Sequence, residues 1–531
     1  MSQEFLSKKM GTDPIFSVLI SLYVSLQKKW GLSPFFEQRG KGIPGSILVS
    51  LSLIILTQLQ PVMALPESNS IEFSNCTLLL PGTTRTTQAR CGWLDVPENP
   101  EDPQGRQIKL HVALAPAAAR NPAPDPLFVF AGGPGQAASE AYVILQPILQ
   151  GIRKDRDIVL IDQRGTGQSN PLRCPMFEDV ETLETAVDLE LTREQTGICL
   201  EGLDGDPRFY TTTIAMQDYD KVRAAMGYET INLYGGSYGT RTAQVYLRLF
   251  PQRVRSIILD SVVPMDLILG SEHAMMLDRS VEETFTACKS DPDCNRLYGE
   301  GIDGLAGLFR DLREAPIDVD FTHPATGKQD TLTVTPDVLA VAIRFLSYSS
   351  ETQAVLPLLI SEAVTNGDLQ RLASQAWMVL SGLSEQLSRG MELSVICSED
   401  YPKMQDSDAD TDTILGNNFL EVMKTSCEVW PQGDVPVDFH EPVSSDVPVL
   451  IITGTRDPVT PPSYADRTAE SFSNSVVLKA QGLGHSVITN VCLRDIATKF
   501  ISAGSLAELD TSCVAKIKPA PFFTSILGPN P

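Results

Sequence analysis

One serine of the chain lies in a pattern that can activate a hydroxyl group. Residues 230–240 read Thr-Ile-Asn-Leu-Tyr-Gly-Gly-Ser-Tyr-Gly-Thr, an apolar run that stops at two glycines and Ser237 and is followed by a helical pattern. The order predicts a strand, a sharp turn and a helix. Gly235 and Gly239 have no Cβ, so strand and helix can approach closely and the serine can project from the turn. We expect Ser237 to be a nucleophile; the alternative is a glycine turn with a surface serine.

A nucleophilic serine needs a base, and His485 is the best placed histidine for this role. In hydrolases with such a turn, the order along the chain is serine, carboxylate, histidine. His485 follows the last predicted strand, in Gly-Leu-Gly-His-Ser at 482–486. The other four histidines precede the serine or fall in less suitable segments: His111, His273, His323 and His440.

Two carboxylates compete for the orienting role. Asp457 lies in Thr-Gly-Thr-Arg-Asp-Pro at 453–458, at the carboxyl end of a predicted strand, where sites of open α/β sheets form. Asp260 ends an earlier strand and remains an alternative. We favour Asp457, because the turn residues around it free its side chain to point into a site.

The oxyanion of an acyl-transfer intermediate requires two backbone donors. The residue after the nucleophile, Tyr238, supplies one N–H group, and the loop after the predicted strand 127–130 supplies the other. That loop reads Gly-Gly-Pro-Gly at 132–135, so Gly133 is the expected donor, with Gln136 as an alternative.

The elements around these residues alternate between short apolar strands and helices. Residues 65–90 are expected to form an irregular arm, and strands are predicted at 91–96, 107–115, 127–130, 157–161, 254–259, 447–453 and 476–479. This order predicts an α/β fold with a mostly parallel sheet covered by helices on both faces. Residues 263–436 break the pattern and predict a mainly helical cap inserted between a first core part, 65–262, and a second, 437–531.

Composition excludes some partners. The 531 residues carry a net charge of −24, whereas a nucleic-acid partner requires a basic surface. The ten cysteines form no Cys-x-x-Cys pair, and no histidine-rich tract is present. We therefore expect neither a metal nor another cofactor.

Residues 1–64 have the pattern of a secretory signal with an extended n-region. A basic flank precedes the apolar run 43–59, and Val-Met-Ala at 62–64 suits cleavage after Ala64; a membrane anchor is the alternative. All ten cysteines lie beyond this point, which supports export to the periplasm or the medium. Their spacing suggests pairing of neighbours along the chain, 76–91, 174–199, 288–294, 397–427 and 492–513, although sequence cannot fix connectivity. No stable membrane insertion is expected after cleavage.

The motifs at 132–135, 162–169 and 235–240 together resemble the prolyl-iminopeptidase group of α/β-hydrolases. The cysteine frame and residues 453–462 are similar to its exported tripeptidyl-aminopeptidase (TAP-like) branch. This resemblance implies an α/β-hydrolase fold and a serine exopeptidase with a triad of Ser237, Asp457 and His485. Ala131 stands where prolyl iminopeptidases usually have histidine, which weakens strict proline specificity. The motif at 162–169 is interpreted as structural.

The substrate is expected to be a peptide or an ester. An aminopeptidase needs a carboxylate for the substrate ammonium, because a buried unpaired ammonium is very costly. Glu399 and Asp400, near the end of the cap, are the candidates, and a solvated acidic turn is the alternative. A carboxylesterase or lipase with the same triad remains open. A non-catalytic binding protein is disfavoured because all three triad residues are present.

Overall fold

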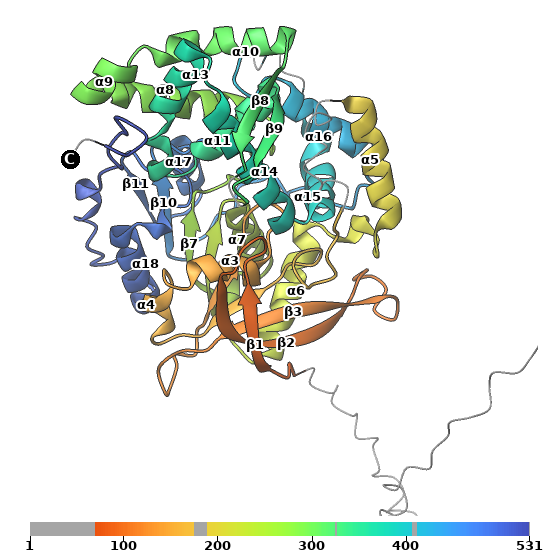
Figure 1. The fold of residues 1–531 in the computed structure, drawn as a ribbon. Helices are drawn as coiled ribbons and strands as arrows, with labels where there is room; N and C mark the ends of the chain where they lie inside the picture. The colour runs from red at the N-terminus through yellow and green to blue at the C-terminus, as the bar shows by residue number, and fades with distance from the viewer. Residues whose placement is uncertain (1–69, 175–187, 324–325, 406–410, 530–531) are drawn as a thin grey trace, which may run out of the picture. The chain divides into compact units, whose positions relative to one another are not determined.

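The computed structural model describes residues 70–174, 188–323, 326–405 and 411–529, and for 379–385 only the backbone. These residues belong to one compact unit (Figure 1). The predicted signal, 1–64, lies outside the described residues. In the described ranges, no helix is both long enough and apolar enough to span a bilayer.

A nine-stranded sheet forms the centre of this unit. Its strand order is β1-β2-β3-β5-β4-β6-β7-β10-β11; the six strands from β5 to β11 are parallel, and β1, β2 and β3 pair antiparallel. The fold is the predicted α/β arrangement with a mostly parallel sheet. The strands are β1 (Ser74–Leu79), β2 (Thr86–Pro97), β3 (Gln107–Ala115), β4 (Leu127–Phe130), β5 (Ile158–Ile161), β6 (Ile231–Gly236), β7 (Val254–Asp260), β10 (Val449–Gly454) and β11 (Ser475–Ala480).

The central strands are short apolar runs because both of their faces are covered. Every residue of β4 and β5 is buried, as expected for strands of a parallel sheet between helical layers. The expected irregular arm at 65–90 is wrong over much of its length, since β1 and the start of β2 lie there. Their polar, exposed residues hid the strand pattern, because β1 is an edge strand that packs on one face only.

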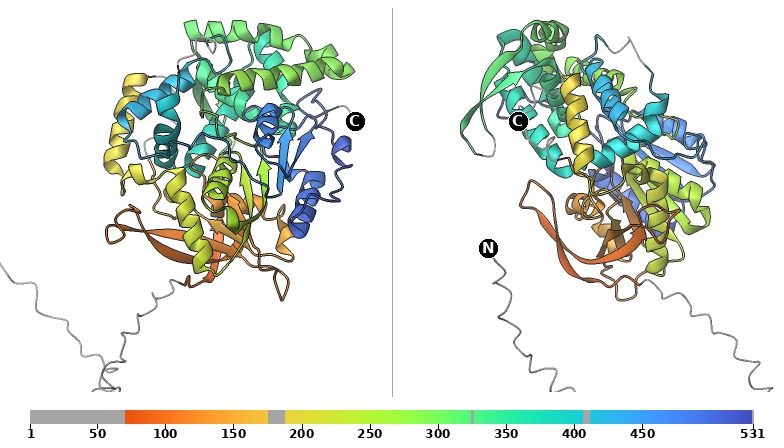
Figure 2. Two further views of the ribbon diagram at one scale, coloured as in Figure 1. Left: turned by 180° about the vertical axis from the view of Figure 1, so that it is seen from behind. Right: turned by 90° about the vertical axis from the view of Figure 1, so that its right-hand side faces the viewer.

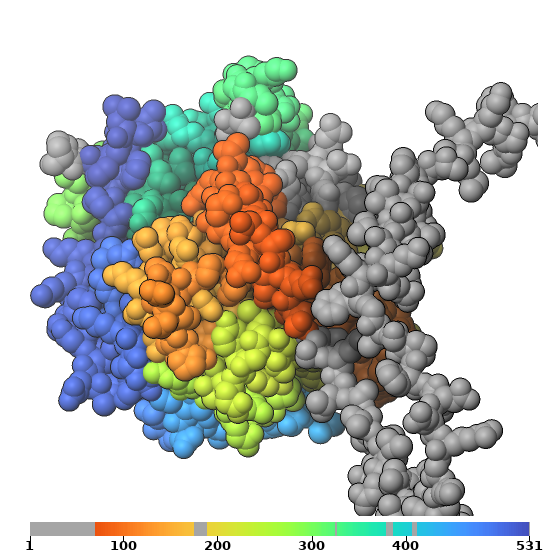
Figure 3. Space-filling view, turned by 90° about the horizontal axis from the view of Figure 1, so that it is seen from below, coloured from red at the N-terminus to blue at the C-terminus, as the bar shows by residue number. Residues whose placement is uncertain are grey.

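Helices cover both faces of the sheet, with a separate apolar core on each side. One face carries α6 (Thr212–Ala225), α7 (Tyr238–Leu249) and α17 (Pro462–Ala469). The other carries α3 (Ala138–Leu145), α4 (Gln150–Arg153) and α18 (Val491–Ala503), so segments from both ends of the unit share one surface (Figure 3).

Between β7 and β10, no described residue adds a strand to the large sheet. The chain instead forms a mainly helical layer over the carboxyl ends of the strands, with its own apolar core (Figures 1 and 2). A two-stranded hairpin, β8 (Ile317–Thr322) and β9 (Gln329–Val334), was not predicted. The main helices are α8 (His273–Ser290), α9 (Pro292–Tyr298), α10 (Leu305–Glu314), α11 (Pro336–Leu346), α12 (Ser350–Gln353), α13 (Leu356–Asn366), α14 (Gln370–Gln386), α15 (Arg389–Val395) and α16 (Asn418–Val429).

Five disulfides close short segments of the chain. They join Cys76 to Cys91, Cys174 to Cys199, Cys288 to Cys294, Cys397 to Cys427, and Cys492 to Cys513. The predicted pairing of sequence neighbours is confirmed for all five. The Cys397–Cys427 bridge ties α16 to the turn that carries Glu399 and Asp400.

Candidate active site

Ser237 lies at the sharp turn between β6 and α7. Its backbone has φ 55° and ψ −126°, a conformation that is strained for a residue with a Cβ and typical of a nucleophile elbow. A Cβ at Gly235 would collide with the carbonyl of Gly239, and one at Gly239 with the carbonyl of Phe130. The two glycines therefore allow the helix to start directly against the strand, as the sequence pattern predicted.

The carboxylate of Asp457 contacts the imidazole of His485. The distance from Oδ2 to Nδ1 is 2.8 Å, and Asp457 is fully buried. Burial alone would lower the pKa of His485, but the charge of Asp457 and its hydrogen bond outweigh burial and raise it above the usual value. Burial opposes ionisation of Asp457, whereas His485 and backbone donors hold its pKa below the usual range.

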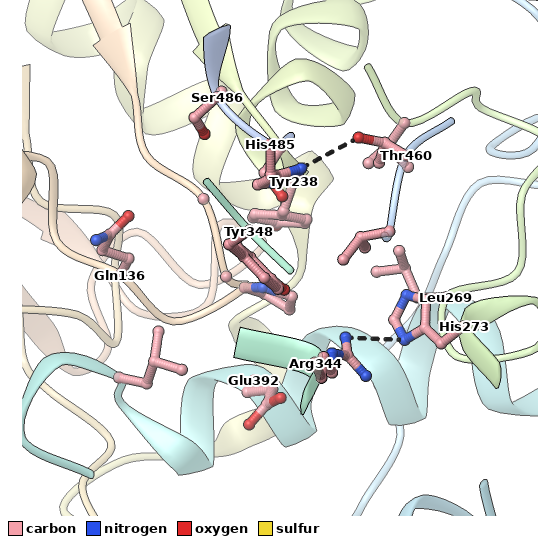
Figure 4. A pocket seen from close by; sticks show the side chains of 18 of the residues that line it. Gln136, Tyr238, Leu269, His273, Arg344, Tyr348, Glu392, Thr460, His485 and Ser486 are labelled. Atoms are coloured by element: carbon pink, nitrogen blue, oxygen red, sulfur yellow. Dashed lines mark hydrogen bonds between the residues drawn. The ribbon is translucent and has the colours of Figure 1, made fainter. Parts of the chain in front are cut away.

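Thr460 completes the surroundings of this pair. Its backbone N–H donates to Asp457 Oδ1 at 2.8 Å, and its hydroxyl lies 2.8 Å from Asp457 Oδ2 and 3.3 Å from His485 Nδ1 (Figure 4). This residue was not predicted from the sequence. An Asp-x-x-Thr spacing is typical of a turn in which the aspartate accepts local backbone hydrogen bonds, and this signal could have revealed it.

Asp260, the competing carboxylate, lies elsewhere in the hydrogen-bond network. It accepts bonds from the backbone N–H groups of Val487 (2.9 Å) and Ile488 (3.2 Å) and from the hydroxyl of Tyr234 (3.1 Å). Burial raises its pKa to about 6, although these donors and His485 counteract the effect. Asp260 therefore fixes the loop that follows His485, while Asp457 contacts the imidazole itself.

The predicted oxyanion donors lie beside the serine. Tyr238 is the first residue of α7, so its N–H has no partner within the helix. The glycine loop passes close to Ser237, since a Cβ at Gly132 would lie 3.3 Å from the Cβ of Ser237. Gly133, with φ +103°, and Gln136 line the same cavity as Ser237 and His485.

A cavity of about 770 Å³ separates the elbow from the cap. Its floor is formed by Ser237, the glycine loop and His485, and its walls are formed largely by apolar side chains of the cap, including Leu269 and Phe419. Figure 4 shows His485 on one side of this space and Arg344 and His273 of the cap on the other. The volume is in the range of ligand pockets and suits an extended segment of a few residues.

The cap contacts the histidine loop directly. The backbone carbonyl of Tyr348, two residues beyond α11, accepts the N–H of His485 at 2.7 Å. The ring of Tyr348 packs edge-on against the imidazole, with 5.1 Å between ring centroids. Tyr348 was missed because no local motif distinguishes it, and only the folded cap brings it to His485.

Glu399 and Asp400 do not line the cavity, so the prediction that they bind the substrate amine is corrected. Both are buried, at 2% and 0% exposure. Asp400 pairs with Arg241 of α7 at 3.0 Å and accepts the N–H of Leu269. Glu399 accepts the N–H and hydroxyl of Thr212, at 2.6 and 2.9 Å. The turn that carries them, η6 (Ile396–Asp400), directs both carboxylates toward the core helices and away from the cavity.

Other charged groups of the cap do line the cavity. Glu392 pairs with Arg389 at 2.6 Å. Asp337, near the start of α11, accepts long bonds from Asn418 Nδ2, at 3.3 Å to Oδ1 and 3.5 Å to Oδ2, and no Lys or Arg nitrogen of the described residues lies within 4 Å of its carboxylate. Burial raises the pKa of Asp337, although the bond from Asn418 and the charge of Arg313 counteract the effect. These residues were not predicted, because a helical cap has no fixed sequence motif.

The motif at 162–169 makes structural contacts. Asp162 accepts from Ser139 and lies 2.8 Å from His111 Nδ1, which ties the start of α3 to the sheet. Arg164 pairs with Asp218 of α6 at 2.7 Å in the buried core. Across the described ranges, no cluster of His, Cys, Asp or Glu side chains could hold a metal ion.

Two family models match the chain at the segments that build this site. The model for the alpha/beta hydrolase fold matches residues 125–300, and the model for TAP-like proteins matches residues 412–513. The chain is therefore a serine hydrolase with the α/β-hydrolase fold. The predicted resemblance to the TAP-like branch is confirmed.

Curated proteins similar to the chain include peptidases and an esterase. Serine protease Hip1 of Mycobacterium tuberculosis (strain H37Rv) is 24% identical over 485 residues, covering 85% of this chain and 92% of the relative. Tripeptidyl aminopeptidase of Streptomyces coelicolor is 25% identical, covering 81% and 84%. Carboxylesterase B of Mycobacterium tuberculosis (strain CDC 1551) is 31% identical over 220 residues, covering 38% and 41%.

Proposed function

We propose that the protein is an exported serine aminopeptidase that releases short segments from peptide N-termini through an acyl-enzyme. The observation that carries the proposal is the 2.8 Å contact between Asp457 and His485, in the cavity whose floor holds the strained Ser237. A cavity closed by a cap suits the end of a peptide chain better than its middle. An internal segment would need two exits from the cavity, one for each flanking part of the substrate.

In this mechanism His485 accepts the proton of Ser237 as the hydroxyl attacks the scissile carbonyl. Asp457 holds the imidazole with Nδ1 protonated and stabilises the imidazolium that forms. The N–H groups of Tyr238 and Gly133 bind the oxyanion, and each is worth about 3–4 kcal/mol of transition-state stabilisation. His485 then passes the proton to the leaving amine, and water repeats the cycle on the ester of Ser237.

The first test is the nucleophile. Ser237→Ala should abolish release of an arylamine from tripeptidyl-arylamides and leave the melting temperature near that of wild type, because the hydroxyl contributes little packing. The exposed Ser290 of α8 provides a matched control, so Ser290→Ala should keep full activity. Equal turnover by the Ser237 variant and wild type would rule out the proposed mechanism.

The second test concerns the amine, and Asp337 replaces Glu399 and Asp400 as the candidate ligand. It is a partly buried carboxylate with no Lys or Arg nitrogen of the described residues within 4 Å, although the charge of Arg313 acts on it from farther away. It lines the cavity at the end of α11 away from His485. Asp337→Asn should raise KM for free-amine peptides by about 10- to 100-fold, the worth of a charge-assisted hydrogen bond. N-acetylated peptides and p-nitrophenyl esters should be almost unaffected, and so should every substrate with the exposed control Asp311→Asn. A uniform loss across both substrate types would assign Asp337 a structural role.

An esterase is the second candidate, supported by the apolar walls of the cavity and by the similarity to a carboxylesterase. The same panel separates the two functions. Hydrolysis of short p-nitrophenyl esters without any cleavage of free-amine peptides would favour the esterase.

Export is supported by the five disulfides, because such bonds persist in oxidising compartments outside the cytoplasm. It is supported further by the cysteine-free leader pattern of residues 1–64. Periplasm and medium are both consistent with these features.

A further inference from the structure

Arg344 is a cation in the active-site cavity without a counter-charge. It lies on α11 and lines the cavity, and no carboxylate of the described residues comes within 4 Å of its guanidinium. One of its nitrogens lies 3.4 Å from His273 Nδ1, and the group lies over the ring of Phe419, 5.0 Å from the centroid (Figure 4). Its Nη1 is buried and has no hydrogen-bond acceptor among the described residues.

The groups that orient Arg344 cannot neutralise it. Phe419 offers only its ring face. His273 is buried, and burial together with the charges of Arg344 and His485 lowers its pKa well below the usual value. A neutral His273 can accept the N–H of Arg344, which fixes the guanidinium in position. The cation is therefore held in a defined orientation with its charge uncompensated.

Two arginines that the core buries completely are compensated. Arg164 pairs with Asp218 at 2.7 Å, and Arg241 pairs with Asp400 at 3.0 Å. Partners of this kind are expected, because removing a charge from water without one costs several kcal/mol. Arg344 has no such partner among the described residues, and it lines a cavity in which a ligand can supply the missing charge.

We propose that Arg344 binds a carboxylate of the substrate, namely an acidic side chain within the N-terminal segment that the enzyme releases. The inference rests on the proposed aminopeptidase function. Arg344 lies seven residues beyond Asp337 on the same helix, about 10 Å along its axis, and one turn before Tyr348, which packs on His485. A segment held by its amine at Asp337 and by its scissile carbonyl at Ser237 would pass Arg344 with its middle side chains. The planar fork of arginine matches a carboxylate with two parallel hydrogen bonds.

The test compares matched tripeptidyl-arylamides that differ only in Glu against Gln at each of the three positions. Wild type should prefer Glu at one position by roughly 10- to 100-fold in kcat/KM. Arg344→Gln should lose this ratio, and Arg344→Lys should keep part of it because the charge remains. Arg389→Gln is the matched control, since Arg389 is already paired with Glu392, and should keep the ratio. Melting temperatures check that each variant is folded.

Three results would overturn the proposal: no Glu preference in wild type, a ratio unchanged in Arg344→Gln, or an equal loss in Arg389→Gln. A second arm identifies the source of the carboxylate by comparing tetrapeptides with a free C-terminus and with a C-terminal amide. A preference that follows only the C-terminal carboxylate would assign Arg344 to the leaving peptide and overturn the proposed position.

A third arm does not depend on peptide cleavage. Ala-Glu-Ala and Ala-Gln-Ala are compared as competitive inhibitors of p-nitrophenyl ester hydrolysis by wild type and Arg344→Gln. Tighter inhibition by Ala-Glu-Ala that disappears in the variant supports the carboxylate site even if peptides are not cleaved. Equal inhibition by the two tripeptides contradicts the site, whatever happens to the proposed function.

Discussion

Two buried aspartates beside the histidine loop show how local contacts divide their roles. Asp457 and Asp260 are both fully buried, yet the pKa of Asp457 is lowered and that of Asp260 is raised to about 6. Asp457 lies against the His485 imidazole, and this contact stabilises the ionised carboxylate. Asp260 meets two backbone N–H groups and a tyrosine hydroxyl, and these do not fully offset its burial.

We therefore expect Asp457→Asn and Asp260→Asn to fail in different ways. Asp457→Asn should lower kcat by about 10⁴-fold with a small change in stability, because the amide favours the wrong tautomer of His485. Asp260→Asn should keep most of its kcat but lose about 1–3 kcal/mol of unfolding free energy, since one backbone donor loses its acceptor. Turnover assays and denaturant titrations of both variants give the comparison. The opposite ranking would transfer the orienting role to Asp260.

At the level of elements, the turn η6 supports the residue that follows the proposed nucleophile Ser237. Glu399 bonds to Thr212, the first residue of α6, and the hydroxyl of Thr212 lies 2.6 Å from that of Tyr238, the residue after Ser237. Burial raises the pKa of Glu399 to about 8, with Asp400 adding to the effect and Arg241 opposing it. A carboxyl that we expected to bind substrate thus joins two core helices.

This contact predicts a pH-dependent stability. The folded protein retains the Glu399 proton up to about pH 8, while the unfolded chain releases it near pH 4.5. The unfolding free energy should therefore fall as pH rises between these values, by up to about 1.4 kcal/mol per pH unit from this group. In Glu399→Gln this contribution disappears, because the amide can mimic the protonated carboxyl at any pH.

The measurement is the difference in unfolding free energy between wild type and Glu399→Gln at pH 5, 6, 7 and 8. Wild type should lose stability relative to the variant as pH rises. Glu314→Gln, at an exposed position of α10, serves as a control whose difference from wild type should stay flat. A constant difference for Glu399→Gln would show that the carboxyl is ionised throughout.

At the scale of the whole described unit, the cap holds the two loops that carry Asp457 and His485. The carbonyl of Arg456, next to Asp457, accepts bonds from Ser280 of α8 at 2.7 Å and from Gln353 of α12 at 2.9 Å. Arg279 donates to the carbonyl of Asp457 itself at 3.0 Å. Cap residues thus fix the loop that carries Asp457, just as the Tyr348 carbonyl fixes the loop that carries His485.

The core and the predicted triad could be read from the sequence because their signals are local. The elbow is a short strand-turn-helix pattern, His485 and Asp457 follow strand ends, and the disulfides join near neighbours. The edge strand β1 escaped notice because one exposed face leaves no apolar run. Glu399 was misassigned because its direction depends on a helical turn packed against α6. Asp337, Arg344 and Tyr348 reach the cavity only through packing of helices distant in the chain.

The fastening of His485 to the cap limits how the protein can exchange substrate and product. A hinged lid swings clear of the machinery it covers, but here lifting the cap would break the bond from His485 to Tyr348 and draw the imidazole away from Asp457. Turnover must therefore proceed with the cap in place, so substrate enters and product leaves through the opening of the cavity. Such an opening admits free chain ends and excludes folded protein surfaces. Under the proposed aminopeptidase function, we therefore expect its substrates to be peptide fragments that another proteinase has already cut.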